Sequence, residues 1–307
     1  MKSKLSPFFS AALALLSAAP VPASDSLSAD VAATVAEEAP SVRSPAEDCL
    51  AAANAGRDAL LEGRAADLYG LLPPSWQKDV DAILRRLGEK VPEDLFVQIT
   101  GLAGELAPLV DEKGGLVAEF LTARPKISES DVRTWGPALR ALSEWKHEDL
   151  REGRFRALFG DDRFAPFLAF LFGRVMEEDG VSFGSFALKD PAQRDKVSLR
   201  FTVTQRRFAG IDEETGRVDW EAVSEEGKLD WVRVEDRWVP DELASSSVTG
   251  QVGWDCLMHG LAESIDEIGP RDVGELSMGV TMLRMVLPKL RECQTVEDLE
   301  RVLDTLD

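Results

Sequence analysis

Between residues 181 and 240 the sequence is a succession of short strand-like runs, and only turn-forming residues separate them. In 197–208, for example, Leu199, Phe201 and Val203 alternate with polar residues, which indicates a strand with one apolar face. No connection is long enough for a helical crossover, so an antiparallel meander is predicted and a parallel nucleotide-binding sheet is not. The predicted strands are 181–188, 197–208, 217–223, 229–234 and 238–240, with turns at 189–191, 214–216, 226–227 and 235–236.

Helical patterning lies on both sides of this region. A capping box at Ser44 and Glu47 opens the first helix, and Gly63 ends it. The sequence therefore predicts an α+β fold in a single domain, 44–307: helices over 44–177, the meander over 181–243, and C-terminal helices over 252–306 that pack back on the rest. The predicted helices are 45–61, 65–72, 76–87, 92–109, 116–122, 131–142, 155–159, 164–176, 254–268, 274–290 and 295–306.

The first 23 residues have the pattern of a secretory signal peptide. Lys2 and Lys4 precede an uncharged, apolar stretch, and Val21-Pro22-Ala23 places small residues at a cleavage site. The stretch is too short to span a membrane comfortably. Residues 24–43 are rich in Ala, Ser, Val and acids without a clear period, which indicates a flexible linker. The mature protein is expected to be periplasmic or secreted.

Charge narrows the choice of partners. The chain has 55 acidic and 35 basic residues, for a net charge of −20. A surface this negative repels phosphate backbones and anionic lipid, so nucleic acid is not an expected partner. After removal of the signal peptide no run of about 18 apolar residues remains, so no membrane span is expected.

Several stretches of the sequence resemble known proteins. The segment from Ala51 to Gly63, followed by Leu68–Pro74, is similar to the opening of secreted bacterial proteins of the nuclear-transport-factor-2-like (cystatin-like) class. The run Trp231–Pro240 is similar to the last strand of their curved sheet, and Leu72–Val80 resembles a stretch of uncharacterised exported bacterial proteins. This resemblance implies leading helices packed on an antiparallel sheet. It does not fix function, because the class includes enzymes, binding proteins and scaffolds.

Three cysteines, Cys49, Cys256 and Cys293, always leave one thiol unpaired if a bridge forms. A Cys256–Cys293 disulfide is favoured slightly, because both lie in the same predicted helical region. The alternative is three buried free thiols that behave as small apolar groups. No two cysteines have the CxxC spacing of a redox or zinc site.

Signatures of serine nucleophiles, phosphate loops and zinc proteases are absent from the sequence. Of the two histidines, His147 belongs to a charged helix face. Helical spacing places Cys256, His259 and Glu263 on one face, where they could bind a transition metal or activate the thiol. The alternative is a half-buried helix stripe with an inert cysteine.

The aromatic residues are a further candidate site. Trp220, Trp231 and Trp238 cluster in the meander, and Tyr69 is the one tyrosine of the chain. These four residues could line a concave face that holds an apolar ligand, or the tryptophans could form the packed core under the helices.

The leading hypothesis is a non-catalytic exported protein, without a cofactor, that binds a protein partner or a small apolar ligand between meander and helices. The first alternative is an enzyme with an acid–base pocket that uses Tyr69, Asp67 or a meander carboxylate such as Asp219. The second is thiol or metal chemistry at Cys256 and His259.

Overall fold

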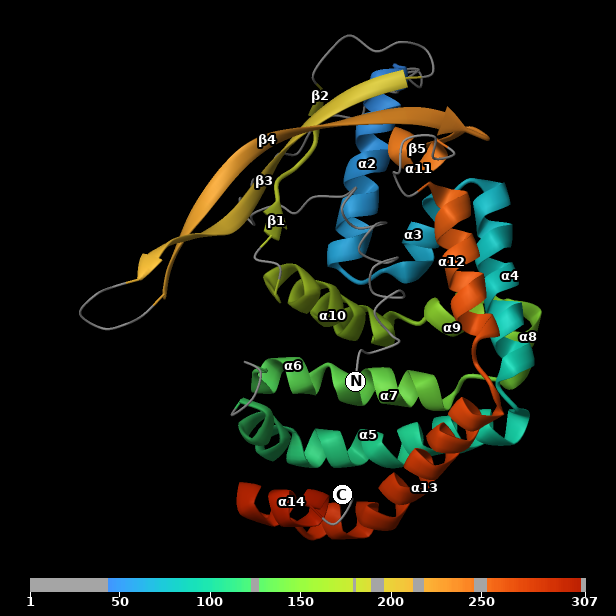
Figure 1. The fold of residues 1–307 in the computed structure, drawn as a ribbon, viewed down its shortest axis with the longest axis vertical. Helices are drawn as coiled ribbons and strands as arrows, with labels where there is room; N and C mark the ends of the chain where they lie inside the picture. Colours follow the sequence, from blue (N-terminus) through green and yellow to red (C-terminus); the bar gives the residue numbers. More distant parts are fainter. Residues whose placement is uncertain are drawn as a thin grey trace, which may run out of the picture.

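The structure is a computed structural model that describes residues 44–122, 127–178, 181–188, 196–211, 218–245 and 253–304. The predicted signal peptide (1–23) and linker (24–43) lie outside these residues, as do the predicted turns at 189–191 and 214–216. Within the described chain the fold is α+β, with helices, then an antiparallel sheet, then helices (Figure 1). This order confirms the predicted fold class.

Helices make up most of the described chain before the sheet. The first begins at the predicted capping box, where Ser44 N–H donates to the Glu47 carboxylate at 2.8 Å and Glu47 N–H donates to Ser44 Oγ at 3.3 Å. The helices are α2 (Pro45–Leu61), α3 (Ala65–Leu71), α4 (Pro74–Lys90), α5 (Glu93–Thr122), α6 (Glu129–Arg133), α7 (Trp135–Ser143), α8 (His147–Glu152), α9 (Phe155–Phe159), the 3₁₀ turn η1 (Asp162–Phe164) and α10 (Ala165–Glu178).

Two of these helices differ from the prediction. The expected break after Leu109 is wrong, because α5 continues through Pro108 to Thr122. Pro108 and Gly104 are both exposed, so water can bind the Gly104 carbonyl that loses its helical donor. The single helix expected over 131–142 is also wrong, because the chain divides at Thr134 into α6 and α7.

Among the described residues the sheet has five strands: β1 (Val181–Phe183), β2 (Ala187–Leu188), β3 (Lys196–Ile211), β4 (Val218–Val234) and β5 (Arg237–Pro240). Their order is β1-β3-β4-β5, with β2 also paired to β3, and every pairing is antiparallel. In Figure 1 the far end of the β3–β4 hairpin projects beyond the helices.

The turn expected at Glu226-Gly227 is wrong, because β4 runs straight through it and Gly227 pairs with Phe201. A Cβ at Gly227 would lie 2.6 Å from the Phe201 ring, so this glycine makes room for an aromatic ring within the sheet. The turn expected at 235–236 is confirmed, since Glu235 and Asp236 both have positive φ between β4 and β5.

Helix α2 covers one face of the sheet. Its buried Cys49 and Ala53 pack against the inward side chains of the strands. Those side chains are Phe186, Val197, Leu199, Leu229, Trp231 and Trp238. The face that the alternation predicts around Leu199 and Phe201 is therefore the main core of the sheet.

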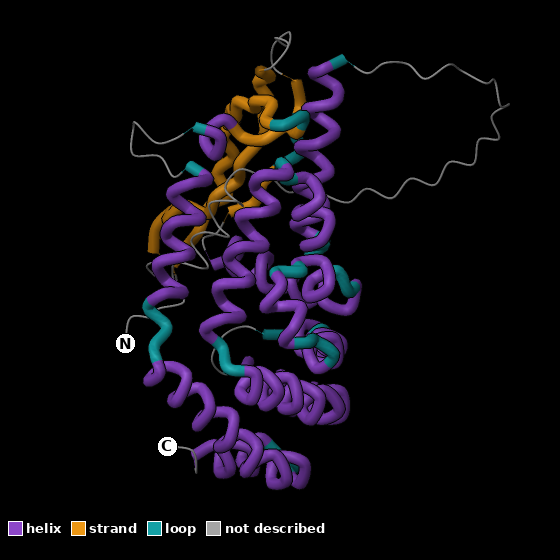
Figure 2. The backbone as a smooth tube through the Cα atoms, turned by 90° about the vertical axis from the view of Figure 1, so that its right-hand side faces the viewer, coloured by secondary structure: helices purple, strands orange, loops and turns teal. Residues whose placement is uncertain are grey.

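The remaining helices, α11 (Asp241–Ala244), α12 (Trp254–Asp266), α13 (Pro270–Glu292) and α14 (Val296–Leu303), return to the N-terminal half as predicted. Helix α12 packs on α4, and α13 packs on α5. Figures 1 and 2 show a stack that runs from the sheet through α10, α7 and α5 to α13 and α14 at the opposite end. No helix in the described part of the chain is both long enough and apolar enough to cross a membrane.

Candidate functional site

The main candidate site is a cavity of about 510 Å³ where α2, α3 and α9 meet. This volume is within the range of sites that hold small molecules. The cavity combines small and apolar side chains with three charged ones. It is lined by Ala55, Arg64, Ala66, Asp67, Gly70, Leu71, Arg156 and Gly160.

Arg156 is the cation that distinguishes this cavity. Its guanidinium carbon lies 5.8 Å from the centre of the Tyr69 ring. A Cβ at Gly70 would lie 3.2 Å from its terminal nitrogen, so the glycine leaves space for the guanidinium. Among the residues that the structure describes, no carboxylate forms an ion pair with Arg156, which leaves its donors open to a ligand.

The other two charged side chains of the cavity are bound to each other. Arg64 forms an ion pair with Asp67, and its Nε donates to Glu62 at 2.7 Å. These carboxylates raise the pKa of Arg64, with the hydrogen bond to Glu62 as the largest cause. All three side chains are substantially exposed, so the cluster adds little to stability. Asp67, a candidate acid–base group of the enzyme hypothesis, is therefore paired with a cation.

Tyr69 does not line the cavity itself but contacts Arg156, which does. Its ring stacks on Phe155 of α9, with centroids 4.7 Å apart and planes within 7°. Its hydroxyl lies 3.0 and 2.9 Å from the two carboxylate oxygens of Asp81 on α4, to which it donates. Burial, and then the Asp81 carboxylate, raise the pKa of Tyr69 to about 12. Tyr69 is therefore a neutral hydrogen-bond donor whose contacts connect α3 with α4 and α9.

The tryptophans of the meander do not form an open ligand surface. Trp231 and Trp238 are only 7% and 9% exposed, and both belong to the core that α2 covers. The prediction that Trp231 and Trp238 line a concave ligand-binding face is therefore wrong, because side chains of α2 fill the space that a ligand would occupy. The side chains of Trp220 and Asp219 lie outside what the structure describes.

The predicted metal site at Cys256, His259 and Glu263 is also not formed. His259 Nε2 lies 3.2 Å from Glu263 Oε1, but the two side chains are 75% and 69% exposed, and Cys256 is exposed as well. Nowhere in the described ranges do three His, Cys, Asp or Glu side chains gather as metal ligands would. Consecutive turns of a solvent-facing helix place these residues side by side without enclosing an ion.

The favoured Cys256–Cys293 disulfide is not formed, and all three cysteines are free thiols. Cys256 lies in the first turn of α12, whereas Cys293 follows the last residue of α13. Because α13 is 23 residues long, about 34 Å of helix separates its start, which follows α12, from Cys293 at its other end. Cys293 is buried there, and its Sγ donates to the Lys289 carbonyl at 3.3 Å.

His147 has a structural role. Its Nε2 donates to the backbone carbonyl of Val91 at 2.9 Å, and its ring packs on Phe96 at 5.3 Å. The imidazole therefore connects the start of α8 with the start of α5.

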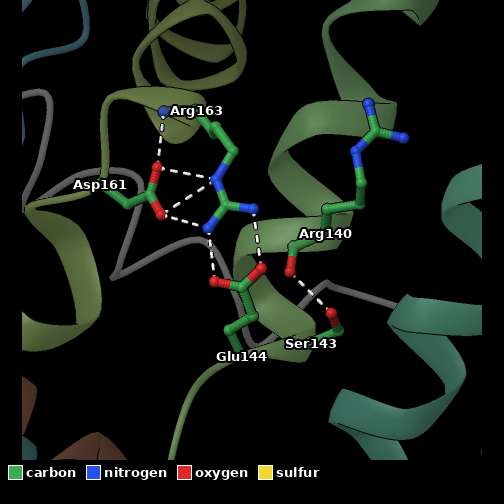
Figure 3. A network of polar contacts seen from close by, with 5 residues as sticks. All are labelled: Arg140, Ser143, Glu144, Asp161 and Arg163. Carbon is green, nitrogen blue, oxygen red and sulfur yellow. Dashed lines mark hydrogen bonds and ion pairs between the residues drawn. The ribbon is translucent and has the colours of Figure 1, made fainter.

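A second polar cluster surrounds Arg163 (Figure 3). Arg163 donates to both oxygens of Glu144, at 2.8 and 2.5 Å, and its Nε lies 3.0 Å from both oxygens of Asp161. Hydrogen bonds from Arg163 hold the pKa of both carboxylates below their usual values. Arg163, Glu144 and Asp161 are paired with one another, and the nearby Arg140 pairs with Asp111 of α5, so the cluster joins η1 to the end of α7 without leaving a charged group for a ligand.

Sequence reasoning found Tyr69 and Asp67 near this site but missed Arg64 and Arg156. The available signals were weak: Arg64 follows the helix-ending Gly63, and Arg156 lies in a short aromatic-rich helix between Gly153 and Gly160. Comparison with known proteins adds no further guide, because no family model matches the chain and no curated protein or solved structure is significantly similar to it.

Proposed function

We propose that the protein is a non-catalytic binding protein that holds a small ligand, with an apolar body and an anionic group, in the α2–α3–α9 cavity. The observation that carries the proposal is the Arg156 guanidinium, which borders the cavity and has no carboxylate partner in the described chain. Guanidinium groups bind carboxylate and phosphate through two parallel hydrogen bonds. Ala55, Ala66 and Leu71 supply the apolar surface for the rest of the ligand.

The state of the neighbouring groups favours binding over catalysis. A general base must be free to accept a proton at working pH. Tyr69 instead donates to Asp81, and its pKa of about 12 keeps it protonated at neutral pH. Asp67 is paired with Arg64. Neither group is therefore free to serve as a general base, while the side chain of Asp219, the third group of the acid–base alternative, lies outside what the structure describes.

We further propose that the protein works outside the cytoplasm, on the evidence of the signal-like residues 1–23. The expected mature chain begins at Ser24, after Val21-Pro22-Ala23. An intact mass of the protein purified from its own source tests this directly. A mass that retains residues 1–23 would contradict export by signal cleavage.

The test of the binding proposal uses two probes of equal length, hexanoate and hexan-1-ol, in isothermal titration calorimetry. The wild-type chain is expected to bind hexanoate at least roughly tenfold more tightly, because only the carboxylate can engage the guanidinium. Arg156→Gln is expected to abolish that preference.

Arg151→Gln provides the matched control, since Arg151 is an exposed arginine on the neighbouring helix α8 and does not line the cavity. It is expected to leave the preference for hexanoate unchanged. The proposal fails if hexanoate binds no better than hexan-1-ol, or if the preference survives Arg156→Gln.

A further inference from the structure

Helix α13 is part of the last layer of the helical stack. In Figures 1 and 2 it lies with α14 at the end opposite the sheet, beyond α5. The inward side of α13 packs Val280 and Leu287 against Leu102 and Leu109 of α5. A terminal layer of this kind normally presents a polar outer face to water.

The outer face of α13 is instead apolar at its centre. Met278, Met282 and Met285 follow one another at spacings of four and three residues, which places them on one side of the helix. Met278 and Met285 are 59% and 65% exposed, and Met282 between them is half-buried. Exposed methionine is adaptable apolar surface of the kind used at binding faces.

Charged residues continue the same spacing in both directions. Glu275 and Arg271 precede Met278 by three and seven residues, while Lys289 and Glu292 follow Met285 by four and seven. All four charged residues are exposed. We call this line of residues, from Arg271 to Glu292 with the three methionines at its centre, the outer stripe. Its alternating spacing of four and three is the pattern of a helix–helix seam.

The order of charges along the outer stripe is self-complementary. If a second copy packs antiparallel about Met282, Glu275 faces Lys289 of the other copy and Arg271 faces Glu292. Met278 then faces Met285, and Met282 lies at the two-fold axis. A parallel arrangement would instead place each charge against its own copy, which is unfavourable.

We propose that the chain forms a two-fold symmetric homodimer in which the outer stripes of two α13 helices pack antiparallel around Met282. Such an interface is isologous, so each charge pair occurs twice. The exposed Arg271–Glu275 pair, at 2.7 Å within one helix, is of a kind that contributes little to stability and can give way to the intermolecular pair. With one helix from each copy the interface is small, and dissociation in the micromolar range is expected. This proposal is independent of the α2–α3–α9 cavity.

Charge exchange tests the pairing. Sedimentation velocity of the full chain across the micromolar range is expected to show a monomer–dimer equilibrium. Glu275→Lys and Lys289→Glu alone should each weaken the dimer roughly tenfold, because each places like charges face to face twice. The double variant Glu275→Lys/Lys289→Glu should restore the wild-type dissociation constant. A wild-type chain that stays monomeric, or a double variant no better than the single ones, overturns the proposal.

Crosslinking tests the position of the axis. In a Cys256→Ser background, Met282→Cys is expected to form a disulfide-linked dimer on mild oxidation, because position 282 meets itself across the two-fold axis. Thr281→Cys is the control, since Thr281 is exposed on the same helix but lies off the outer stripe. Equal crosslinking by both variants overturns the proposal. A monomer in which the thiol at position 282 resists alkylation also overturns the proposal. That result would indicate that residues 24–43 or another protein bind the outer stripe instead.

Discussion

The hydroxyl of Tyr69 donates to the Asp81 carboxylate, with oxygen–oxygen distances of 3.0 and 2.9 Å. Because Tyr69 lies on α3 and Asp81 on α4, this contact fixes the helix that carries Asp67 and Gly70 of the cavity. The Phe155 ring stacked on Tyr69 extends the same connection to α9 and Arg156. Tyr69 therefore links the helices that carry Asp67 and Arg156 of the cavity.

The first prediction concerns alkaline pH. Tyr69 is the one tyrosine of the chain, so tyrosinate absorbance reports this residue alone. With a folded pKa raised to about 12 and an ordinary unfolded value near 10, the folded state keeps its proton longer. The stabilisation is complete below pH about 10 and is lost as pH rises toward 12, so the unfolding free energy should fall across that window. Tyr69→Phe should lose about 1 kcal/mol at neutral pH and also lose this alkaline slope.

Absorbance titration and denaturant unfolding at several pH values provide the measurements. A tyrosinate midpoint near 10 in the folded protein would contradict the contact between Tyr69 and Asp81.

The second prediction concerns Gly63, which ends α2 with a φ of +68°. A Cβ at this position would lie 2.0 Å from the Ala165 carbonyl oxygen at the start of α10. Gly63→Ala combines backbone strain with a clash against main chain that cannot move aside, so it should destabilise by about 3 kcal/mol or more. Gly173→Ala, in α10 with nothing within 4 Å of the added Cβ, is the control. It should be neutral or stabilise by up to ~1 kcal/mol, as alanine does in helices. Equal losses for both variants would rule out the clash.

Gly63 and Gly227 illustrate how far the sequence alone reaches. The sequence predicts the end of α2 at Gly63 correctly, because a left-handed residue closes the helix and its local hydrogen bonds suffice to form the cap. The turn that the sequence predicts at Gly227 is wrong, because the residue that requires a glycine there is Phe201, 26 residues away in the chain. Local signals therefore identify caps and the two-residue turn at 235–236, but a glycine that accommodates a distant ring gives the same local signal as a turn.

The candidate site was less predictable for the same reason. Arg64 and Arg156 become neighbours only when α3 and α9 pack, and nothing in their immediate sequence requires that packing. The tryptophans of the sheet show a different limit of sequence-based prediction. Trp231 and Trp238 do lie together in the sheet, but whether such rings form a cleft or a core depends on α2, whose Cys49 and Ala53 fill the face.

The third prediction concerns the contact between α12 and α4. Trp254 stacks on Trp76 at 4.4 Å, and its Nε1 donates to Asp79 at 2.8 Å. Trp254→Phe removes this donor and leaves a half-buried carboxylate unsatisfied, so we expect a loss of about 2–3 kcal/mol. The matched control is Trp135→Phe, because Trp135 Nε1 is buried without a hydrogen-bond partner. It should cost clearly less in denaturant unfolding, and a larger loss at Trp135 would contradict the role of Asp79.

The last prediction concerns the thiols. Cys256 is exposed, whereas Cys49 and Cys293 are buried, at 0% and 3% exposure. Burial raises the pKa of Cys49 to about 12 and also raises the pKa of Cys293, so both stay protonated and unreactive in the folded state. An aromatic disulfide reagent should therefore modify one thiol per folded chain and three after unfolding. Cys256→Ser should abolish the reaction of the folded chain. A folded variant that still reacts would show that a buried cysteine is the reactive one. If a Cys256–Cys293 disulfide forms under oxidising conditions, only one thiol would react after unfolding. That count would contradict the free thiols of the structure, in which α13 separates Cys293 from α12.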